Sequence, residues 1–252
     1  MAQNIYDDPQ FFDGYSQFPR SRDGLAAAAE WPSLRAMLPD LRGKNILDLG
    51  CGFGFFAEWA AQQGAAHIHG IDVSEKMLAV AREKCADLPV SFERADLETA
   101  EFDTARYDLV FSSLAVHYLE DFSAFCNRVR RALKDDGRFV FSTEHPVFAA
   151  RANPEFMTDA EGYMVGAVND YLREGQRLTN WIADGVVKHH RLISTTINAL
   201  QATGLRLDAI EEWSASDADI AAHPEWEKER YQPMFLLLAT SVDPLVPISS
   251  LP

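Results

Sequence analysis

The feature that most constrains the fold of this chain is an apolar strand that runs directly into three glycines. Residues Ile46–Phe55 read ILDLGCGFGF, and a second apolar segment, HIHGID, ends further along on Asp72. Glycine lets the backbone approach a ligand closely, and the N-terminus of the following helix offers unpaired N–H groups. A carboxylate at the end of the second strand can accept both hydroxyls of a ribose. Together the two segments predict a nucleotide-like or nucleoside-like ligand at the strand ends.

The rest of the chain alternates strand and helix patterns at regular spacing. Buried strands are expected at 45–50, 67–72, 90–96, 106–113 and 137–144, and helices at 55–64, 75–85 and 123–134, with Ser74 as an N-cap. A helix at 194–204 separates two more strands at 205–213 and 233–240. This order predicts an α/β fold, a Rossmann-like doubly wound sheet of seven strands, mostly parallel with the last strand antiparallel.

Insertions flank this regular core. We expect a single domain of residues 1–252 and divide it into the core and the segments around it. The segments are an N-terminal cap arm (1–35), the cofactor-binding core (36–145), a lid insertion (146–185), the C-terminal part of the sheet (186–240) and a tail (241–252). The arm is irregular but rich in aromatic residues, so we expect it to pack on the domain. The lid is a long irregular stretch that includes Tyr163, Tyr171 and Trp181, which favours a functional lid.

Composition excludes several classes of partner. The formal net charge of −15 argues against nucleic acid or an anionic membrane as partner, and no apolar run is long enough to span a membrane. Nothing at the N-terminus resembles a signal peptide. Three cysteines without CxxC or His/Cys spacing indicate free thiols and no metal site. We therefore expect a cytoplasmic monomer or homodimer.

Four elements in order make the ligand prediction specific. They are D-x-G-x-G-x-G at 48–54, the acid Asp72, the segment ADLETAEF at 95–102 and the strand with its loop YDLVFSSLAVHYLED. In this combination the chain resembles the class I S-adenosylmethionine-dependent methyltransferases, especially the small-molecule bacterial enzymes. The resemblance implies S-adenosyl-L-methionine as cofactor and in-line methyl transfer to a small-molecule acceptor.

The resemblance also implies roles for individual residues. Asp48 would orient the glycine loop or meet the cofactor's ammonium group through water, Asp72 would accept the ribose hydroxyls, and Asp96 would accept from the adenine amino group. Their alternative roles are to bind loop amides (Asp48) and to cap a turn (Asp96). The residues expected to bind the cofactor are Tyr15, Arg20, Asp48, Gly50, Cys51, Gly52, Gly54, Asp72, Val73, Met77, Asp96, Leu97 and Ser112. Of these, Met77 is alternatively plain helix core and Arg20 a surface residue.

Candidate catalytic residues follow the predicted strands. His145 and His117 come after the fifth and fourth strands, and His190 and Arg191 precede the helix that follows the lid. Histidine suits a general base because its pKa lies near neutrality. Alternatively His117 is a core residue, Arg191 pairs with an acid, and catalysis needs no base. The aromatic lid suggests a flat, partly apolar acceptor. A non-catalytic protein that binds the cofactor and an NAD(P)-dependent oxidoreductase are the other functions considered.

Overall fold

A seven-stranded sheet forms the centre of the computed structural model, which describes residues 3–151, 156–166 and 168–248. Its strands are β1 (Asn45–Leu49), β2 (His67–Asp72), β3 (Val90–Arg94), β4 (Tyr107–Ser113), β5 (Leu133–Glu144), β10 (Leu205–Trp213) and β11 (Phe235–Val242). They lie in the order β10-β11-β5-β4-β1-β2-β3. β11 pairs antiparallel with both neighbours, whereas the pairs from β5 to β3 are parallel. The predicted Rossmann-like fold is confirmed.

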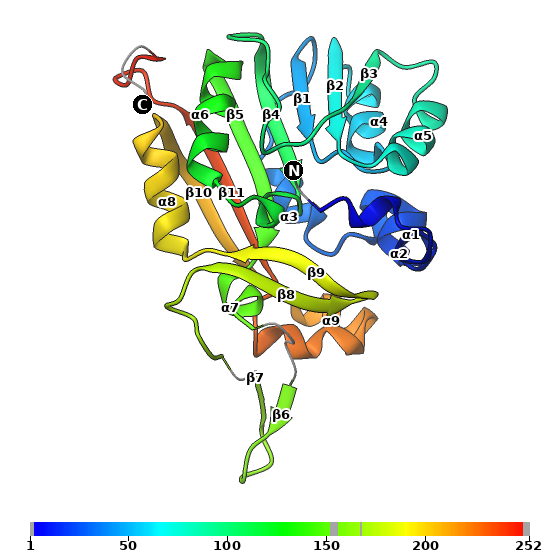
Figure 1. The fold of residues 1–252 in the computed structure, drawn as a ribbon, viewed down its shortest axis with the longest axis vertical. Coiled ribbons are helices and arrows are strands. Elements are labelled where there is room, and N and C mark those ends of the chain that lie inside the picture. The colour runs from blue at the N-terminus through cyan, green and yellow to red at the C-terminus, as the bar shows by residue number, and fades with distance from the viewer. Residues whose placement is uncertain (1–2, 152–155, 167, 249–252) are drawn as a thin grey trace.

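Helices cover both faces of this sheet (Figure 1). α6 (Phe122–Ala132) and α8 (Ile193–Ala202) pack on one face, and α3 (Trp31–Ala36) and α4 (Phe55–Gln62) pack on the other. α5 (Glu75–Lys84) packs beside β3 and begins at Ser74, whose hydroxyl accepts the Met77 N–H as predicted. Strands buried on both faces read as continuous apolar runs, which is why they could be recognised from sequence.

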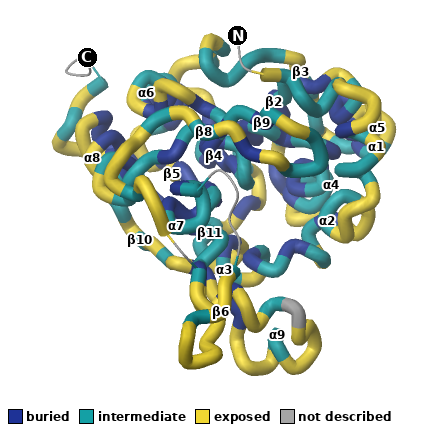
Figure 2. The backbone as a smooth tube through the Cα atoms, turned by 60° about the horizontal axis from the view of Figure 1, so that its bottom comes forward, coloured by how far each residue is buried: buried dark blue, intermediate teal, exposed yellow. Residues whose placement is uncertain are grey.

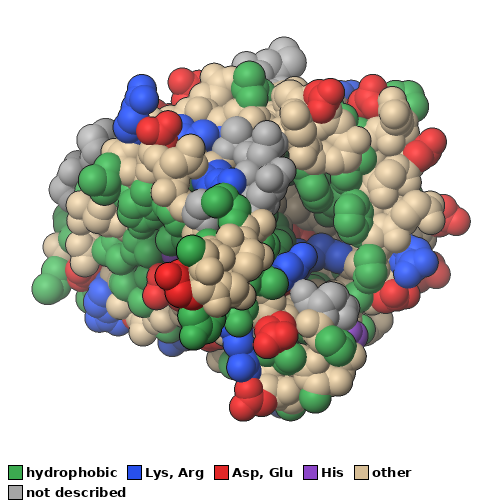
Figure 3. All heavy atoms as spheres, turned by 90° about the horizontal axis from the view of Figure 1, so that it is seen from below, with side chains coloured by type: hydrophobic (Ala, Val, Ile, Leu, Met, Phe, Trp, Pro, Cys, Tyr) green, Lys and Arg blue, Asp and Glu red, His purple; other side chains and the backbone are tan. Residues whose placement is uncertain are grey.

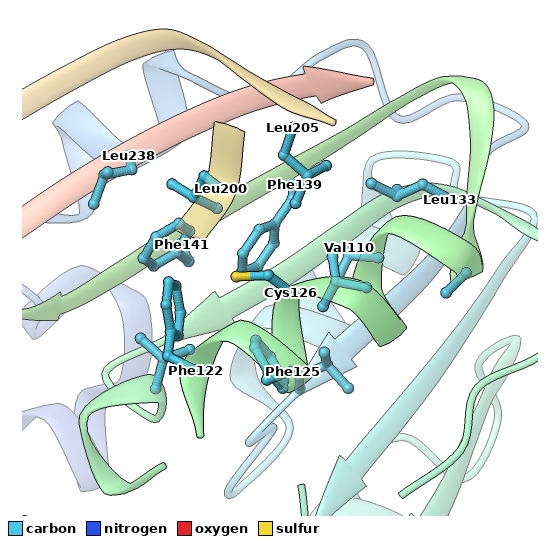
Figure 4. Close-up of a cluster of buried hydrophobic side chains, with 14 of the residues drawn as sticks. Val110, Phe122, Phe125, Cys126, Leu133, Phe139, Phe141, Leu200, Leu205 and Leu238 are labelled. Atoms are coloured by element: carbon cyan, nitrogen blue, oxygen red, sulfur yellow. The ribbon is translucent and has the colours of Figure 1, made fainter. Parts of the chain in front are cut away.

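The face under α6 holds a cluster of buried aromatic and aliphatic side chains (Figure 4). Phe139 and Phe141 of β5 stack with ring centroids 4.5 Å apart, and both are fully buried. Phe125 of α6 meets Phe139 edge to face. These contacts fix α6 against the strands whose carboxyl ends carry the candidate site.

The N-terminal arm is helical, so the prediction of an irregular segment was wrong. It contains η1 (Ile5–Asp7), α1 (Pro9–Ser16), α2 (Pro19–Asp23) and η2 (Gly24–Ala27) before α3. The Asp8 carboxylate accepts the Phe11 N–H and caps α1. The arm packs on the domain as expected, because the Asp7 carboxylate accepts hydrogen bonds from the Ser74 hydroxyl at 2.6 Å and the Lys76 N–H at 3.2 Å.

The lid is built largely of antiparallel hairpins, which corrects the prediction of an irregular stretch. After α7 (Pro146–Ala149) come β6 (Phe156–Thr158) paired with β7 (Met164–Gly166), and β8 (Gly175–Trp181) paired with β9 (Ala183–His190). β8 and β9 lie across the end of the sheet at which β5 terminates (Figure 1). A second insertion holds α9 (Asp217–Ala222) and η4 (Pro224–Arg230).

The buried residues and the exposed residues lie in different parts of the fold. Figure 2 shows buried residues concentrated in the central strands and exposed ones in the hairpin and helices that project from the sheet. The predicted tail begins slightly too early, because β11 runs to Val242 and the Asp243 N–H then donates to the Gly204 carbonyl at 2.8 Å. Positions 1–2, 152–155, 167 and 249–252 of the predicted arm, lid and tail lie outside the described residues. Among the described helices, none is long and apolar enough to cross a membrane.

We expect Phe139→Ala to lower the free energy of unfolding by about 3–5 kcal/mol, because a stacked, fully buried ring leaves a cavity. Urea denaturation followed by circular dichroism measures the change. Ile210→Ala is the matched control, since Ile210 is 41% exposed on β10, and it should cost less than about 1 kcal/mol. Equal losses in the two variants would contradict the assignment of Phe139 to the core.

Candidate active site

The glycine loop connects β1 to α4 through three left-handed residues. Gly50, Gly52 and Gly54 have φ of +74°, +52° and +74°, which L side chains rarely adopt. A Cβ on Gly50 would lie 2.4 Å from the Cβ of Ala115, whereas a Cβ on Gly52 would have no neighbour within 4 Å and would enter open space. The loop thus presents bare backbone to a cavity.

The carboxylates of Asp48, which is buried, and of Asp72, which is half-buried, face the same cavity. Asp72 accepts the Gly52 N–H at 2.8 Å and the Ser74 N–H at 2.9 Å, one at each oxygen. Asp48 is 2% exposed, and its Oδ2 has no hydrogen-bond partner among the described residues. Burial, and secondly the nearby charge of Asp72, hold the pKa of Asp48 well above its usual value. Neither carboxylate pairs with a described Lys or Arg, so the cavity suits a cationic ligand.

Four further residues that were predicted to bind the cofactor line this cavity. Val73, Met77, Asp96 and Leu97 all border it, as do the glycines Gly50 and Gly52 and Cys51. The Asp96 Oδ1 also accepts the Glu98 N–H at 3.0 Å, so the turn-capping role occurs together with the position at the cavity. Gly54 lies at the start of α4, where a Cβ would meet Ala81 at 3.0 Å.

The arm closes the cavity with Tyr15 and Arg20. The Tyr15 ring stacks on Phe53 of the glycine loop, with centroids 6.2 Å apart. Arg20 forms a salt bridge with the buried carboxylate of Glu30, which also lines the cavity. Glu30 had not been predicted, and its position just before α3 gave no sequence signal for this contact.

A second, larger hollow of about 1220 Å³ opens beside the first, between the arm, the lid hairpin and the second insertion. We call the first cavity the inner chamber and this hollow the outer chamber. Figure 3 shows a hollow on this face of the molecule, bordered by hydrophobic side chains with basic groups beside it. The residues that line both chambers are Tyr6, Tyr15, Arg20, Leu114 and Tyr118. They mark the junction at which two ligands would meet.

The junction carries a hydroxyl pair and a strained residue. The hydroxyls of Tyr6 and Tyr118 lie 2.9 Å apart, and burial raises the pKa of both phenols, so both are protonated. Leu114 has φ of +53°, which is rare for a bulky residue and typical of functional sites. Sequence reasoning missed Tyr6 and Leu114 as site residues, and the aromatic type of Tyr6 was the available signal. Tyr118 follows the fourth strand beside His117, a position that predicted proximity to the methyl group.

His145 does not lie at the mouth of the site, contrary to the prediction. Its Nδ1 accepts the Val147 N–H and caps α7, and its Nε2 lies 2.8 Å from Glu212. The residue is buried, and it lines neither chamber. Both ring nitrogens are therefore occupied by structural contacts. In the sequence STEHPVF the histidine follows a strand, but the same pattern is also typical of a helix N-cap that is followed by a proline.

Three further predicted residues also point away from the chambers. The His190 Nε2 donates to the Tyr171 carbonyl at 2.7 Å, and Arg191 donates to the Leu119 carbonyl at 2.5 Å while lying over Phe122. The Ser112 hydroxyl donates to the Leu49 carbonyl at 2.7 Å inside the sheet, and the adjacent Ser113 lines the inner chamber instead. Alternation along a strand explains the error at Ser112.

His117 is the predicted histidine that lines the outer chamber. It is 5% exposed, and its Nδ1 has no hydrogen-bond partner among the described residues. Burial lowers its pKa to about 4, while Glu144 raises it and Lys188 and Arg191 lower it further, so the imidazole is neutral at physiological pH. Glu144 ends β5 and forms a salt bridge with Lys188 of β9 in the same chamber. This pair was not predicted.

Doubly wound sheets bind ligands where the strand order reverses, here between β1 and β4, and the inner chamber opens there. Two carboxylates that pair with no described Lys or Arg, together with an accessible glycine backbone, fit a nucleoside that carries positive charge and no phosphate. These features define the class: a nucleoside-binding α/β protein with a second ligand chamber. Among the described residues, no group of three or more His, Cys, Asp or Glu could hold a metal ion.

Comparison with known proteins identifies the family. A methyltransferase-domain model matches residues 46–137. An S-adenosylmethionine-dependent methyltransferase from Mesorhizobium loti is 49% identical, with a TM-score of 0.84 over 86% of this chain and 100% of that one. A putative S-adenosylmethionine-dependent methyltransferase from Listeria monocytogenes is 37% identical, with a TM-score of 0.78 over 86% and 99%. An uncharacterized protein of Haemophilus influenzae is 31% identical over 90% of both chains.

The chain belongs to the S-adenosylmethionine-dependent methyltransferases. It is an enzyme that uses S-adenosyl-L-methionine, as predicted, and the nicotinamide alternative is set aside. This cofactor carries an ammonium and a sulfonium group. The inner chamber suits it, because the Asp48 Oδ2 has no hydrogen-bond partner among the described residues and the space at Gly52 is open.

The low pKa of His117 predicts a specific acid sensitivity. In the unfolded chain this histidine takes up a proton below about pH 6.5, whereas in the folded protein it does so only near pH 4. Folding stability is therefore lost as pH falls from 6.5 to 4, by up to roughly 3 kcal/mol from this residue. We expect His117→Asn to remove that part of the loss, measured by urea denaturation at pH 7.5 and 4.5. An unchanged pH dependence in the variant would contradict the burial of a neutral imidazole.

Proposed function

We propose that this enzyme transfers the methyl group of S-adenosyl-L-methionine, held in the inner chamber, to a small-molecule acceptor in the outer chamber. The observation that carries the proposal is the shared junction: Tyr6, Tyr15, Arg20, Leu114 and Tyr118 border both chambers. An acceptor there would contact the cofactor directly, as an in-line displacement requires.

A small acceptor is favoured by the shape of the outer chamber and by charge. Segments of the arm, the lid hairpin and the second insertion border the outer chamber, so a small molecule can lie between them. A net charge of −15 opposes binding of nucleic acid. The three cysteines are free and buried, which is consistent with a reducing cytoplasm as the location.

The cofactor-binding residues are assigned by their positions at the inner chamber. The backbone of Gly50, Cys51 and Gly52 would lie against the cofactor, and Asp72 would accept the ribose hydroxyls with the oxygen lone pairs that its two N–H bonds leave free. Asp48 would bind the ammonium group, which would give its buried Oδ2 a partner. Asp96, Leu97, Val73 and Met77 would border the adenine.

When bound, the cofactor supplies an electrophilic methyl group. The chain's own contribution is to hold the acceptor at the junction, exclude water and accept a proton. His117 is the proposed proton acceptor, because its neutral imidazole lines the outer chamber and lacks a hydrogen-bond partner among the described residues. Arg20 and Tyr15 would cover the cofactor's methionine end.

We expect Asp72→Ala to weaken binding of S-adenosylhomocysteine on the order of 100-fold or more, because it removes a charged acceptor and releases the Gly52 and Ser74 N–H groups. Isothermal titration calorimetry measures the affinity. Asp103→Ala, which removes an exposed carboxylate paired with Arg106, should leave it unchanged. If the wild-type protein binds neither S-adenosylmethionine nor S-adenosylhomocysteine, the proposed function is wrong.

A further inference from the structure

The wall of the outer chamber is rich in aromatic side chains. They come from the arm, the segment after β4, the lid, the second insertion and the start of β11, and they are Tyr6, Tyr15, Phe18, Tyr118, Phe148, Phe156, Trp181, Trp226 and Phe235. The Trp181 ring contacts the rings of Phe11 and Tyr15 edge to face, with centroids 5.7 and 5.9 Å apart. Such a wall binds a ligand by area and ring contacts, so it favours a planar, apolar body.

One ion pair and one imidazole form a largely buried polar cluster in this chamber. Glu144 and Lys188 are joined by a salt bridge, with side chains 13% and 8% exposed. The Lys188 Nζ also lies 5.1 Å from the centroid of the Trp181 ring. The bond from Lys188 is the one hydrogen bond that the Glu144 carboxylate makes with described residues, so its second oxygen keeps its accepting capacity. His117 adds a second acceptor.

The charges of the chamber decide which polar group it can take. Lys188 offsets the charge of Glu144, and His117 is neutral, so the buried cluster carries no net charge. Arg20 is likewise offset by Glu30. The remaining charged side chains are Asp23 and Lys228, which are exposed, and Arg151, which is partly exposed. A charge on the acceptor that is buried beside Glu144, Lys188 and His117 would therefore have no compensating partner within that cluster, which is costly.

We propose that the acceptor is an uncharged aromatic alcohol, a phenol, whose ring lies against the aromatic wall and whose hydroxyl donates to His117 or Glu144. This deepens the proposed function and rests on it. Glu144 and Lys188 are then specificity-determining residues, because their mutual neutralisation rejects both ammonium and carboxylate acceptors. Protonated amines would need Glu144 without Lys188, and carboxylates would need Lys188 without Glu144.

The transfer step balances with groups that are present. A lone pair of the phenol oxygen forms the new O–C bond, while the methyl–sulfur bond breaks and leaves its electron pair on sulfur. The phenolic proton passes to the unprotonated ring nitrogen of His117 and leaves to water when the ether product departs. A weak base suffices, because the proton becomes strongly acidic as the oxygen gains its third bond.

Three matched probes test the class of acceptor: 2-naphthol, naphthalene-2-carboxylate and protonated 2-(aminomethyl)naphthalene. Their affinities are measured by calorimetry on the full chain saturated with S-adenosylhomocysteine. We expect 2-naphthol to bind at least about tenfold more tightly than either charged probe. With S-adenosylmethionine, mass spectrometry should detect 2-methoxynaphthalene. A charged probe that binds as tightly as 2-naphthol, or no binding of 2-naphthol up to its solubility limit, overturns the proposal.

Substitution of the ion pair should reverse the preference. Glu144→Gln leaves Lys188 unpaired, so affinity for naphthalene-2-carboxylate should rise about tenfold while that for 2-naphthol falls. The double variant Glu144→Gln with Lys188→Met is the matched control and should show no such rise. His117→Asn should slow methylation of 2-naphthol about 100-fold. All variants must keep the wild-type affinity for S-adenosylhomocysteine, which shows that they fold.

The outcomes separate the two proposals. If S-adenosylhomocysteine binds and the carboxylate or amine probe is methylated in place of 2-naphthol, the acceptor class is wrong and the proposed function stands. If Glu144→Gln does not raise the affinity for the carboxylate probe, the ion pair is not the specificity determinant. Failure of the wild-type chain to bind S-adenosylhomocysteine removes both proposals together.

Discussion

The rest of the site depends on how the ends of β1 and β2 hold the glycine loop. The N–H groups of Gly50 and Cys51 both donate to the Ile71 carbonyl, at 2.8 and 3.1 Å, and the Gly52 N–H donates to Asp72. Three consecutive backbone donors are thereby fixed by one strand end. The loop can then turn through left-handed conformations without a partner inside the cavity, and its exposed side stays free for a ligand. Asp72 serves the fold and the proposed ribose contact with the same carboxylate.

This arrangement has a cost that ligand binding would offset. Asp48 is buried and Asp72 is half-buried near it, and the loss of solvation raises the pKa of both. In the absence of a cation such carboxylates destabilise the folded state. A ligand with an ammonium and a sulfonium group would make the electrostatic environment of these carboxylates favourable. Cofactor binding and folding stability are therefore coupled. The same electrostatics that weaken the apo protein would select a cationic nucleoside over a phosphorylated one.

The parts of the structure that sequence predicted are those that local patterns determine. Strands β1 to β5 are buried apolar runs, and the glycine loop with Asp48 and Asp72 lies within one strand–helix–strand unit. The pairing of β8 with β9 was not predicted, because β8 has few apolar residues and only Thr179 along it is buried. The arm helices had a signal that was not used, since α1 and α2 each begin at a proline.

The candidate catalytic residues were harder to predict because position after a strand does not determine where a side chain points. His145 follows β5 by one residue, yet its ring caps the helix that begins there. Glu144, its neighbour, faces the outer chamber and meets Lys188, which lies 44 residues further along the chain. That contact exists only because β9 crosses the end of the sheet. The ion pair between Glu144 of β5 and Lys188 of the lid therefore contributes both to the shape of the outer chamber and to its charge. Neither property could be predicted from one of the two segments alone.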